Sequence, residues 1–174
     1  RFRGHMGMSV IGGDDERKIW MDFHWCLPSS FEGRMLRLFD LGNHIEDQLV
    51  HFIKKTDVFD VSAVDGNGDQ YRASYLGGHF GGSCDGFVKR VIDEDPEQVL
   101  VFEAKSANNT RFNALVKLED YQAWSKTYQW QIHCYMGCFD LKKTMVVVMN
   151  KNNSQIYSEI IDFNPEIWEQ AKEK

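Results

Sequence analysis

Two neighbouring segments, GSCDGFVKRVI (82–92) and QVLVFEAKSA (98–107), decide the fold. Both are rich in apolar and β-branched residues, which is typical of strands. The acidic segment DEDPE (93–97) between them contains a proline and is typical of a turn. The pattern therefore predicts two paired strands joined by an acidic turn.

The open end of this hairpin gathers charged side chains. Residues two apart in a strand point to the same face, so Glu103 and Lys105 project together, opposite to Phe102 and Ala104. Asp85 stands at the entry to the preceding strand, where the paired ends of the hairpin meet. The spacing therefore predicts two carboxylates and one lysine at a single place.

These three side chains predict a metal site. The sequence Glu-Ala-Lys alone is more often a plain ion pair on a strand face. Asp85 changes that interpretation, because two adjacent carboxylates repel unless a cation neutralises them. Hard oxygen ligands of this kind suit Mg²⁺ or Mn²⁺. We therefore expect a divalent cation between Asp85 and Glu103, beside Lys105.

The remaining chain alternates helical and strand patterns. Helices are predicted over 14–25 (capped by Asp14 or Asp15), 31–55, 118–140 and from 164 onward, and strand hairpins over 58–64 with 70–80 and over 143–150 with 154–163. Gly42 lies inside the second helix, where glycine costs about 1 kcal/mol relative to alanine and marks close packing or a functional contact. The order predicts a single α/β domain (1–174) with a mixed central sheet flanked by helices.

Charge and composition exclude several classes of protein. The net charge of −6 argues against binding nucleic acid through bulk positive charge. It is compatible with an enzyme that gathers acids around a metal and keeps a local basic groove. No apolar run approaches the ~20 residues of a membrane helix, and no secretory signal is visible. We expect a cytoplasmic protein without a membrane partner.

The four cysteines, Cys26, Cys84, Cys134 and Cys138, form no CxxC pair. This pattern predicts reduced thiols rather than a disulfide framework. Cys134 and Cys138 lie one helical turn apart and could bind a metal, but two small core residues are the favoured interpretation. An iron–sulfur cluster would need all four to converge, so none is expected.

The acidic pair and the lysine together resemble the PD-(D/E)xK nuclease superfamily. Asp85 matches its first acidic position, and Glu103-Ala104-Lys105 matches its (D/E)xK element. Cys84 stands where the usual proline would be. The resemblance implies a restriction-endonuclease-like core and a metal held by Asp85, Glu103 and the backbone carbonyl of Ala104.

The segment LGNHIEDQLV (41–50) narrows the resemblance to lambda-exonuclease-like and RecB-like nucleases. These place a helix-borne Glu or His four residues after a glycine, which here is Gly42. Glu46 fits that place, on the helix face of Leu49, and His44 is two residues off it. The resemblance makes Glu46 a further ligand of this cation or of a second one, so one or two ions are expected; taken alone, it would be a solvated helix residue.

The segment YQWQIHCYM (128–136) supplies a further element of the resemblance, in which Gln131 and Tyr135 are four residues apart. The resemblance places Gln131 at the rim of the active site and Tyr135 near DNA. Gln129 is a weaker candidate for the same role. Without the resemblance, the segment would be an aromatic core stripe that includes Tyr128.

Other residues are assigned to DNA or to a cluster by the same resemblance. Ser9 and Arg17, in an N-terminal stretch similar to that of phage members, would lie near the DNA path. Related nucleases with an iron–sulfur cluster carry a cysteine near position 14 or 15, where this chain has aspartates. Candidate contacts to the DNA backbone are Lys89, Arg90, Arg111, Lys117 and Lys126.

The function expected from these features is metal-dependent hydrolysis of DNA, as by an exonuclease of phage recombination or repair. A single-strand annealing protein and further copies of the chain are the expected protein partners. The alternatives are an endonuclease of the same fold, restriction-type or junction-cleaving, and an inactive DNA-binding module. A structural metal or redox protein built on the cysteines and histidines receives little support from their spacing.

Overall fold

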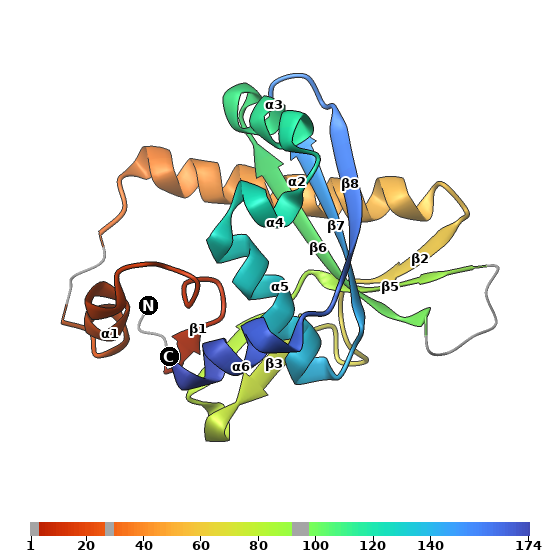
Figure 1. Cartoon of the computed structure of the whole chain (residues 1–174). Coiled ribbons are helices and arrows are strands. Elements are labelled where there is room, and N and C mark those ends of the chain that lie inside the picture. Colours follow the sequence, from red (N-terminus) through yellow and green to blue (C-terminus); the bar gives the residue numbers. More distant parts are fainter. Residues whose placement is uncertain (1–3, 27–29, 92–97) are drawn as a thin grey trace.

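The computed structural model describes residues 4–26, 30–91 and 98–174, so the predicted turn at 93–97 lies outside it. The main sheet has the spatial order β2-β5-β6-β7-β8. Its strands are β2 (Phe59–Ser62), β5 (Gly86–Arg90), β6 (Leu100–Ala107), β7 (Lys143–Asn150) and β8 (Ile156–Asp162). The β6–β7 pair is parallel and the others are antiparallel, which confirms the predicted mixed sheet (Figure 1).

A second, smaller sheet corrects one prediction. It contains β1 (Met6–Gly7), β4 (Phe80–Ser83) and β3 (Arg72–Tyr75), and the short helix η1 (Leu76–Gly78) joins β3 to β4. The predicted hairpin over 58–64 and 70–80 is wrong, because β2 pairs with β5 while β3 pairs with β4. One bridge, between Val64 and Gln70, remains of it in the described part of the chain. Each of the two segments pairs with a strand other than the one next to it in the predicted hairpin.

Helix α2 (Gly33–Lys54) covers one face of the main sheet. Its buried residues Ile45, Leu49 and Ile53 pack with Phe102 and Ala104 of β6. The shorter α1 (Glu16–Phe23) begins as predicted at Asp15, whose side chain accepts from the Lys18 N–H. Both predicted helices are thus confirmed. Gly42 is not a close-packing position, since a Cβ there would meet no atom within 4 Å among the described residues.

The other face of the main sheet is covered by α3 (Asn109–Leu118), α4 (Tyr121–Trp124) and α5 (Lys126–Phe139), and α6 (Pro165–Glu173) packs on α5. The predicted single helix over 118–140 is wrong in its first part. Glu119 takes a left-handed conformation with φ of 52° and ends α3, and Ser125 is extended between α4 and α5. The helical spacing of apolar residues did not reveal these breaks, because the apolar stripe continues across them.

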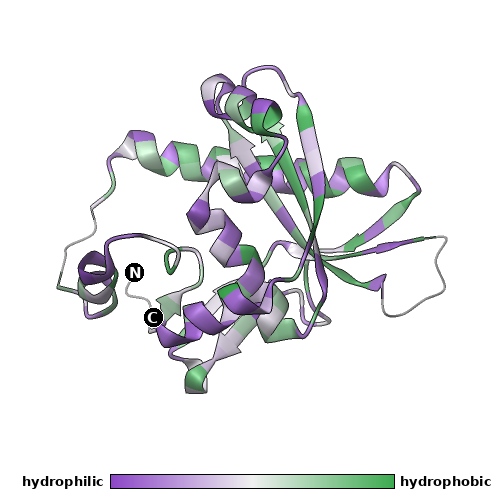
Figure 2. Ribbon diagram, in the orientation of Figure 1, coloured by the Kyte–Doolittle hydropathy of each residue, from purple (hydrophilic) through white to green (hydrophobic). Residues whose placement is uncertain are grey.

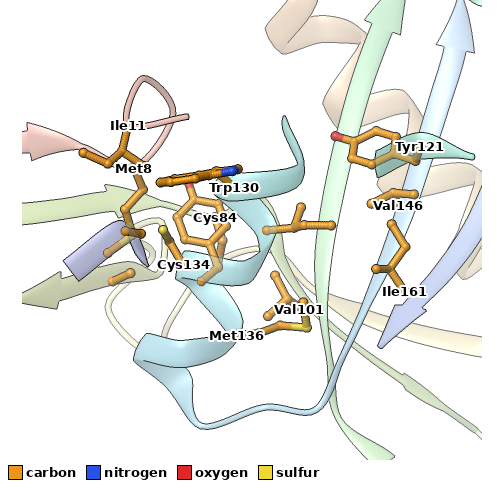
Figure 3. Packing of buried hydrophobic residues seen from close by; sticks show 14 of the residues in the cluster. Met8, Ile11, Cys84, Val101, Tyr121, Trp130, Cys134, Met136, Val146 and Ile161 are labelled. Carbon is orange, nitrogen blue, oxygen red and sulfur yellow. The ribbon is translucent and has the colours of Figure 1, made fainter. Parts of the chain in front are cut away.

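The buried core lies on both faces of β6 and β7, which are hydrophobic along most of their length (Figure 2). On the α5 side, Trp130 and Cys134 lie beside Met8 and Ile11 of the N-terminal loop, and Met136 lies beside Val101 of β6 (Figure 3). Within the described residues, no helix is long and apolar enough to cross a membrane. Because both faces of β6 are buried in the core, a charged side chain on this strand is unusual.

Candidate active site

Asp85 occupies the junction between the two sheets, directly after β4 and before β5. Gly86 pairs with Phe102 in the β5–β6 ladder, which brings Asp85 beside Glu103 as predicted. Its Oδ2 accepts a hydrogen bond of 2.8 Å from the Ala104 N–H. The backbone makes this geometry possible through Gly86, whose φ is 147° and whose Cβ, if present, would lie 2.4 Å from the Ser62 carbonyl oxygen.

Glu103 is buried among apolar side chains on the α5 side of β6. It is 1% exposed, and its neighbour across the parallel pair is Val146. Glu103 Oε1 accepts from the Lys105 ammonium, while Oε2 has no hydrogen-bond partner among the described residues. A buried carboxylate oxygen without a partner is costly. Glu103 Oε2 is therefore the oxygen of the site that packing leaves without a partner among the described residues.

Three carboxyl groups share this site and hold protons more tightly than usual. Burial raises the pKa of Glu103 to about 8, with further repulsion from Asp85. Burial, and then the charge of Asp85, raise the pKa of Glu46 to about 7. Burial also raises the pKa of Asp85, against the opposing attraction of Lys105. The fold therefore brings Glu46 within electrostatic reach of the Asp85–Glu103 pair.

Lys105 provides the positive charge of the site. Although burial opposes its charge, Glu103 and Asp85 hold the pKa of Lys105 well above its usual range. Its Nζ also lies 5.5 Å from the centroid of the Tyr128 ring. The lysine therefore remains protonated, and it sits between a carboxylate and an aromatic face.

The predicted glutamine lies in α5 and reaches the site through a short chain of hydrogen bonds. Gln131 is buried, and its Nε2 donates to Tyr135 Oη at 3.1 Å. Tyr135 Oη in turn donates to the Ser83 carbonyl oxygen at 2.6 Å, two residues before Asp85. Tyr135 is only 2% exposed, so its observed contact positions the strand end; Gln129 is half-buried. Gln131 and Tyr135 thus connect α5 to the backbone that carries Asp85.

Aromatic residues that the sequence did not predict as part of the site surround Lys105. Tyr128 stacks with Tyr121, with centroids 6.0 Å apart, and both lie near Trp124. The Arg111 guanidinium lies over Trp124 at 4.9 Å and Tyr128 at 5.8 Å. The predicted DNA contact Arg111 therefore joins the site through these rings. Tyr121 lies three residues before Trp124 and seven before Tyr128, so it continues the stripe that includes Gln131, and nothing in the pattern distinguished it from a core residue.

The other predicted DNA contacts lie outside this constellation. Ser9 is half-buried in the N-terminal loop, which packs against α5 where a Gly12 Cβ would touch Thr127. The remaining candidates are exposed: Arg17 in α1, Lys89 and Arg90 in β5, Lys117 in α3, and Lys126, which pairs with Asp14. They remain predictions that depend on the path of the DNA.

The cysteines and His44 take ordinary positions. Cys84 and Cys134 are buried in the core, Cys138 is half-buried and Cys26 is exposed. His44 is exposed and lies 3.7 Å from Asp40, one helical turn away. The burial of Cys134 agrees with its interpretation as a core residue, and the role of Glu46 stays a prediction.

The donor atoms of the site fit a divalent cation of hard character. Asp85 and Glu103 offer carboxylate oxygens, and the unpartnered Glu103 Oε2 is the atom that calls for a ligand. No group of three His, Cys, Asp or Glu side chains close enough to hold a metal occurs in the described ranges. Side chains alone therefore form an incomplete set, which the predicted Ala104 carbonyl and water would complete.

Solved structures share this fold over almost the whole chain. The alkaline exonuclease LHK-Exo from Laribacter hongkongensis matches with a TM-score of 0.68 and 16% identity, over 98% of this chain and 83% of its own. Its complex with dAMP matches over the same shares with a TM-score of 0.69 and 16% identity. A phage-related exonuclease from Haemophilus somnus 129PT matches with 0.62 and 14% identity, over 95% and 76%. No protein-family model and no characterised protein matches the sequence itself.

Proposed function

We propose that this protein is a metal-dependent deoxyribonuclease that hydrolyses phosphodiester bonds at the site of Asp85, Glu103 and Lys105. One observation carries the proposal: a buried carboxylate oxygen, Glu103 Oε2, lacks a partner among the described residues, beside a second carboxylate and a lysine. Structural ion pairs in cores normally satisfy their oxygens. A site that leaves one free is better suited to binding a cation and a phosphate.

The roles of the residues follow from their chemistry. Asp85, Glu103 and the Ala104 carbonyl would hold Mg²⁺ or Mn²⁺, with Glu46 as a further acidic group. A divalent cation here lowers the pKa of a water molecule and neutralises charge on the phosphate. Lys105, which stays protonated, would orient the attacking water or stabilise the phosphate charge that develops. Gln131 would hold a water or a phosphate oxygen at the rim.

We favour an exonuclease over an endonuclease. The solved structures with this fold include an alkaline exonuclease and a phage-related exonuclease, and one of them holds dAMP, a deoxynucleoside monophosphate. A role in phage recombination or repair fits the same comparison. Arg111, fixed on Trp124, is the basic residue best placed for a DNA phosphate near Lys105.

The deciding experiment compares end-labelled linear DNA with closed circular DNA, each with Mg²⁺, Mn²⁺ or EDTA, using Glu103→Ala as the matched control. The proposal expects the wild-type protein to release mononucleotides from linear DNA, and not from circular DNA, with either metal. No cleavage is expected in EDTA or with the variant. Cutting of circular DNA would favour the endonuclease. DNA binding without cleavage would favour the inactive module, and an active Glu103→Ala protein would refute the site.

A further inference from the structure

A second polar atom near Lys105 has no partner: the hydroxyl of Tyr121. Tyr121 is fully buried, and its Oη makes no hydrogen bond within the described ranges. Burying a hydroxyl without a partner costs free energy, and phenylalanine would fill the same space without that cost. The hydroxyl therefore calls for an explanation that packing does not supply.

Tyr121 is held in place from two sides. Its N–H donates to Glu159 Oε2 at 2.9 Å, and the same oxygen accepts from Tyr157 Oη at 2.6 Å. Its ring stacks on Tyr128 at an interplanar angle of 18°. Figure 3 shows the ring beside Val146 and Ile161, with the hydroxyl end directed away from both and toward β6. The hydroxyl is thus fixed and points to the strand that carries Glu103 and Lys105.

The electrostatics connect Tyr121 with those two residues. Burial raises the pKa of Tyr121 well above its usual range, with opposing attraction from Lys105 and repulsion from Glu103. The hydroxyl therefore remains protonated and neutral, and it can accept a hydrogen bond as well as donate one. Lys105, with three N–H donors, pairs with Glu103 Oε1 and faces the ring of Tyr128.

Lys105 and a divalent cation compete for the same carboxylate. When Glu103 oxygens ligate a cation, the like charge of the cation repels the lysine ammonium from Oε1. The Lys105 side chain is about four-fifths buried, with 19% of it exposed, so a second acceptor within the site would favour the displaced ammonium. Among the described residues, the Tyr121 hydroxyl is a neutral buried atom without a partner whose electrostatics couple it to Lys105.

We propose that Tyr121 is a positioning residue that acts through Lys105: its hydroxyl accepts a hydrogen bond from the ammonium when Glu103 takes up the cation. This inference rests on the proposed function. Lys105 then has two positions, on Glu103 without the cation and on Tyr121 with it. The second position keeps the ammonium at the site, oriented toward water and phosphate, while it frees the carboxylate.

The test is Tyr121→Phe, which removes only the hydroxyl. Calorimetric titration should show Mn²⁺ affinity weakened about ten-fold, the effect of losing one hydrogen bond to a charged group. The melting temperature of the metal-free protein should stay the same or rise, because no bond is lost there. Tyr75→Phe, the same change in a tyrosine of β3 that packs on Trp168 outside the site, should bind Mn²⁺ like the wild type.

A second background separates positioning from packing. In Lys105→Ala, the additional Tyr121→Phe change should leave Mn²⁺ affinity unaltered, since the two residues act as one unit. Wild-type affinity in Tyr121→Phe, or an equal loss in the Lys105→Ala background, would overturn the inference. Wild-type protein that binds no Mn²⁺ and cleaves no DNA would instead overturn the proposed function, so the two failures are distinguishable.

Discussion

Two buried polar clusters on either side of α5 differ in how their hydrogen bonds are completed. In one, His133 Nε2 donates to Gln122 Oε1 at 2.9 Å, and Nδ1 accepts from the Asn164 N–H at 3.2 Å. In the other, Glu103 and Tyr121 each leave an oxygen without a partner in the described part of the chain. The first cluster is complete and needs no ligand.

The difference separates structure from chemistry. Burial lowers the pKa of His133 to about 4, so the imidazole is neutral and uses both nitrogens to join α4, α5 and the start of α6. The carboxyl groups of Glu103 and Glu46 instead have raised pKa values, because burial and repulsion from Asp85 disfavour their charged forms. A satisfied cluster stabilises the fold, whereas an unsatisfied one is costly unless a bound group completes its hydrogen bonds.

Removing the carboxylate charge should have the largest effect. Asp85→Asn and Glu103→Gln should each lower the cleavage rate by at least about 10³-fold, because several kcal/mol of transition-state stabilisation depend on the cation. The metal-free variants should melt at the same or a higher temperature, since repulsion in the site decreases. Steady-state rates and thermal melts measure both. Substantial cleavage by Glu103→Gln would place the chemistry elsewhere.

Glu46→Gln should have a smaller effect on the cleavage rate, because Glu46 lies on α2 and interacts with the Asp85–Glu103 pair electrostatically. We expect a rate about 10 to 100-fold lower and a higher Mg²⁺ requirement. His44→Ala, a change at an exposed residue two positions away, is the control and should act like the wild type. Equal Mg²⁺ dependence in Glu46→Gln and wild type would make Glu46 a surface residue.

The raised pKa values predict how Mn²⁺ affinity depends on pH. Protons compete with the cation for Glu103, whose pKa is about 8, and for Glu46, whose pKa is about 7. Affinity should rise from about pH 6 to about pH 8, by up to about tenfold per unit for each proton released. Metal-free stability should change the opposite way, falling as pH rises from the unfolded value of 4.5 through the folded values. Calorimetry in two buffers counts the protons; no release would contradict the prediction.

The complete cluster should respond in stability rather than in rate. His133→Phe leaves Gln122 and the Asn164 N–H without their partner and should cost about 1–3 kcal/mol in the free energy of unfolding. The cleavage rate of the folded variant should remain near that of the wild type. Urea unfolding and a rate measured well below the midpoint test the two halves separately. A large loss of cleavage rate with unchanged stability would show that the His133 cluster serves the reaction rather than the fold.

Gly42→Ala should have the smallest effect on the fold and tests whether substrate passes α2. A Cβ there meets open space, so the change should stabilise the protein by up to about 1 kcal/mol. Lower DNA affinity together with higher stability would indicate that DNA or a ligand approaches the helix at this glycine. Unchanged affinity would make Gly42 a helix position without a contact.

The sequence predicted the main elements where the hydrophobic period was long and regular. Helix α2, the β5–β6 pair and the β7–β8 pair are confirmed, and the spacing of Asp85 and Glu103 correctly brought both carboxylates together. The local sequence pattern gave the wrong strand pairing where the pairing depends on strands that are distant in the sequence. The segments 58–64 and 70–80 have hairpin-like patterns, yet their strands pair with β5 and β4.

The site was predictable in its charged residues and not in its aromatic ones. A Glu-x-Lys pattern on a strand specifies a face, but the approach of Tyr121 depends on a short helix, α4, that begins at the left-handed end of α3. Helix α3 itself was missed, although Asn108 caps it by accepting from the Arg111 N–H. Nothing in the pattern around Tyr121 distinguishes its hydroxyl from that of any other core tyrosine.

Gly86 has a consequence for how this chain tolerates substitution. Any other residue there would meet the Ser62 carbonyl oxygen and would need an unfavourable backbone conformation, so a library randomised at position 86 should return glycine even under selection for folding alone. Position 85 should accept many residues under that selection and require aspartate only when cleavage is demanded. Two adjacent positions thus carry different constraints, one architectural and one chemical, and only the pair of selections would tell them apart.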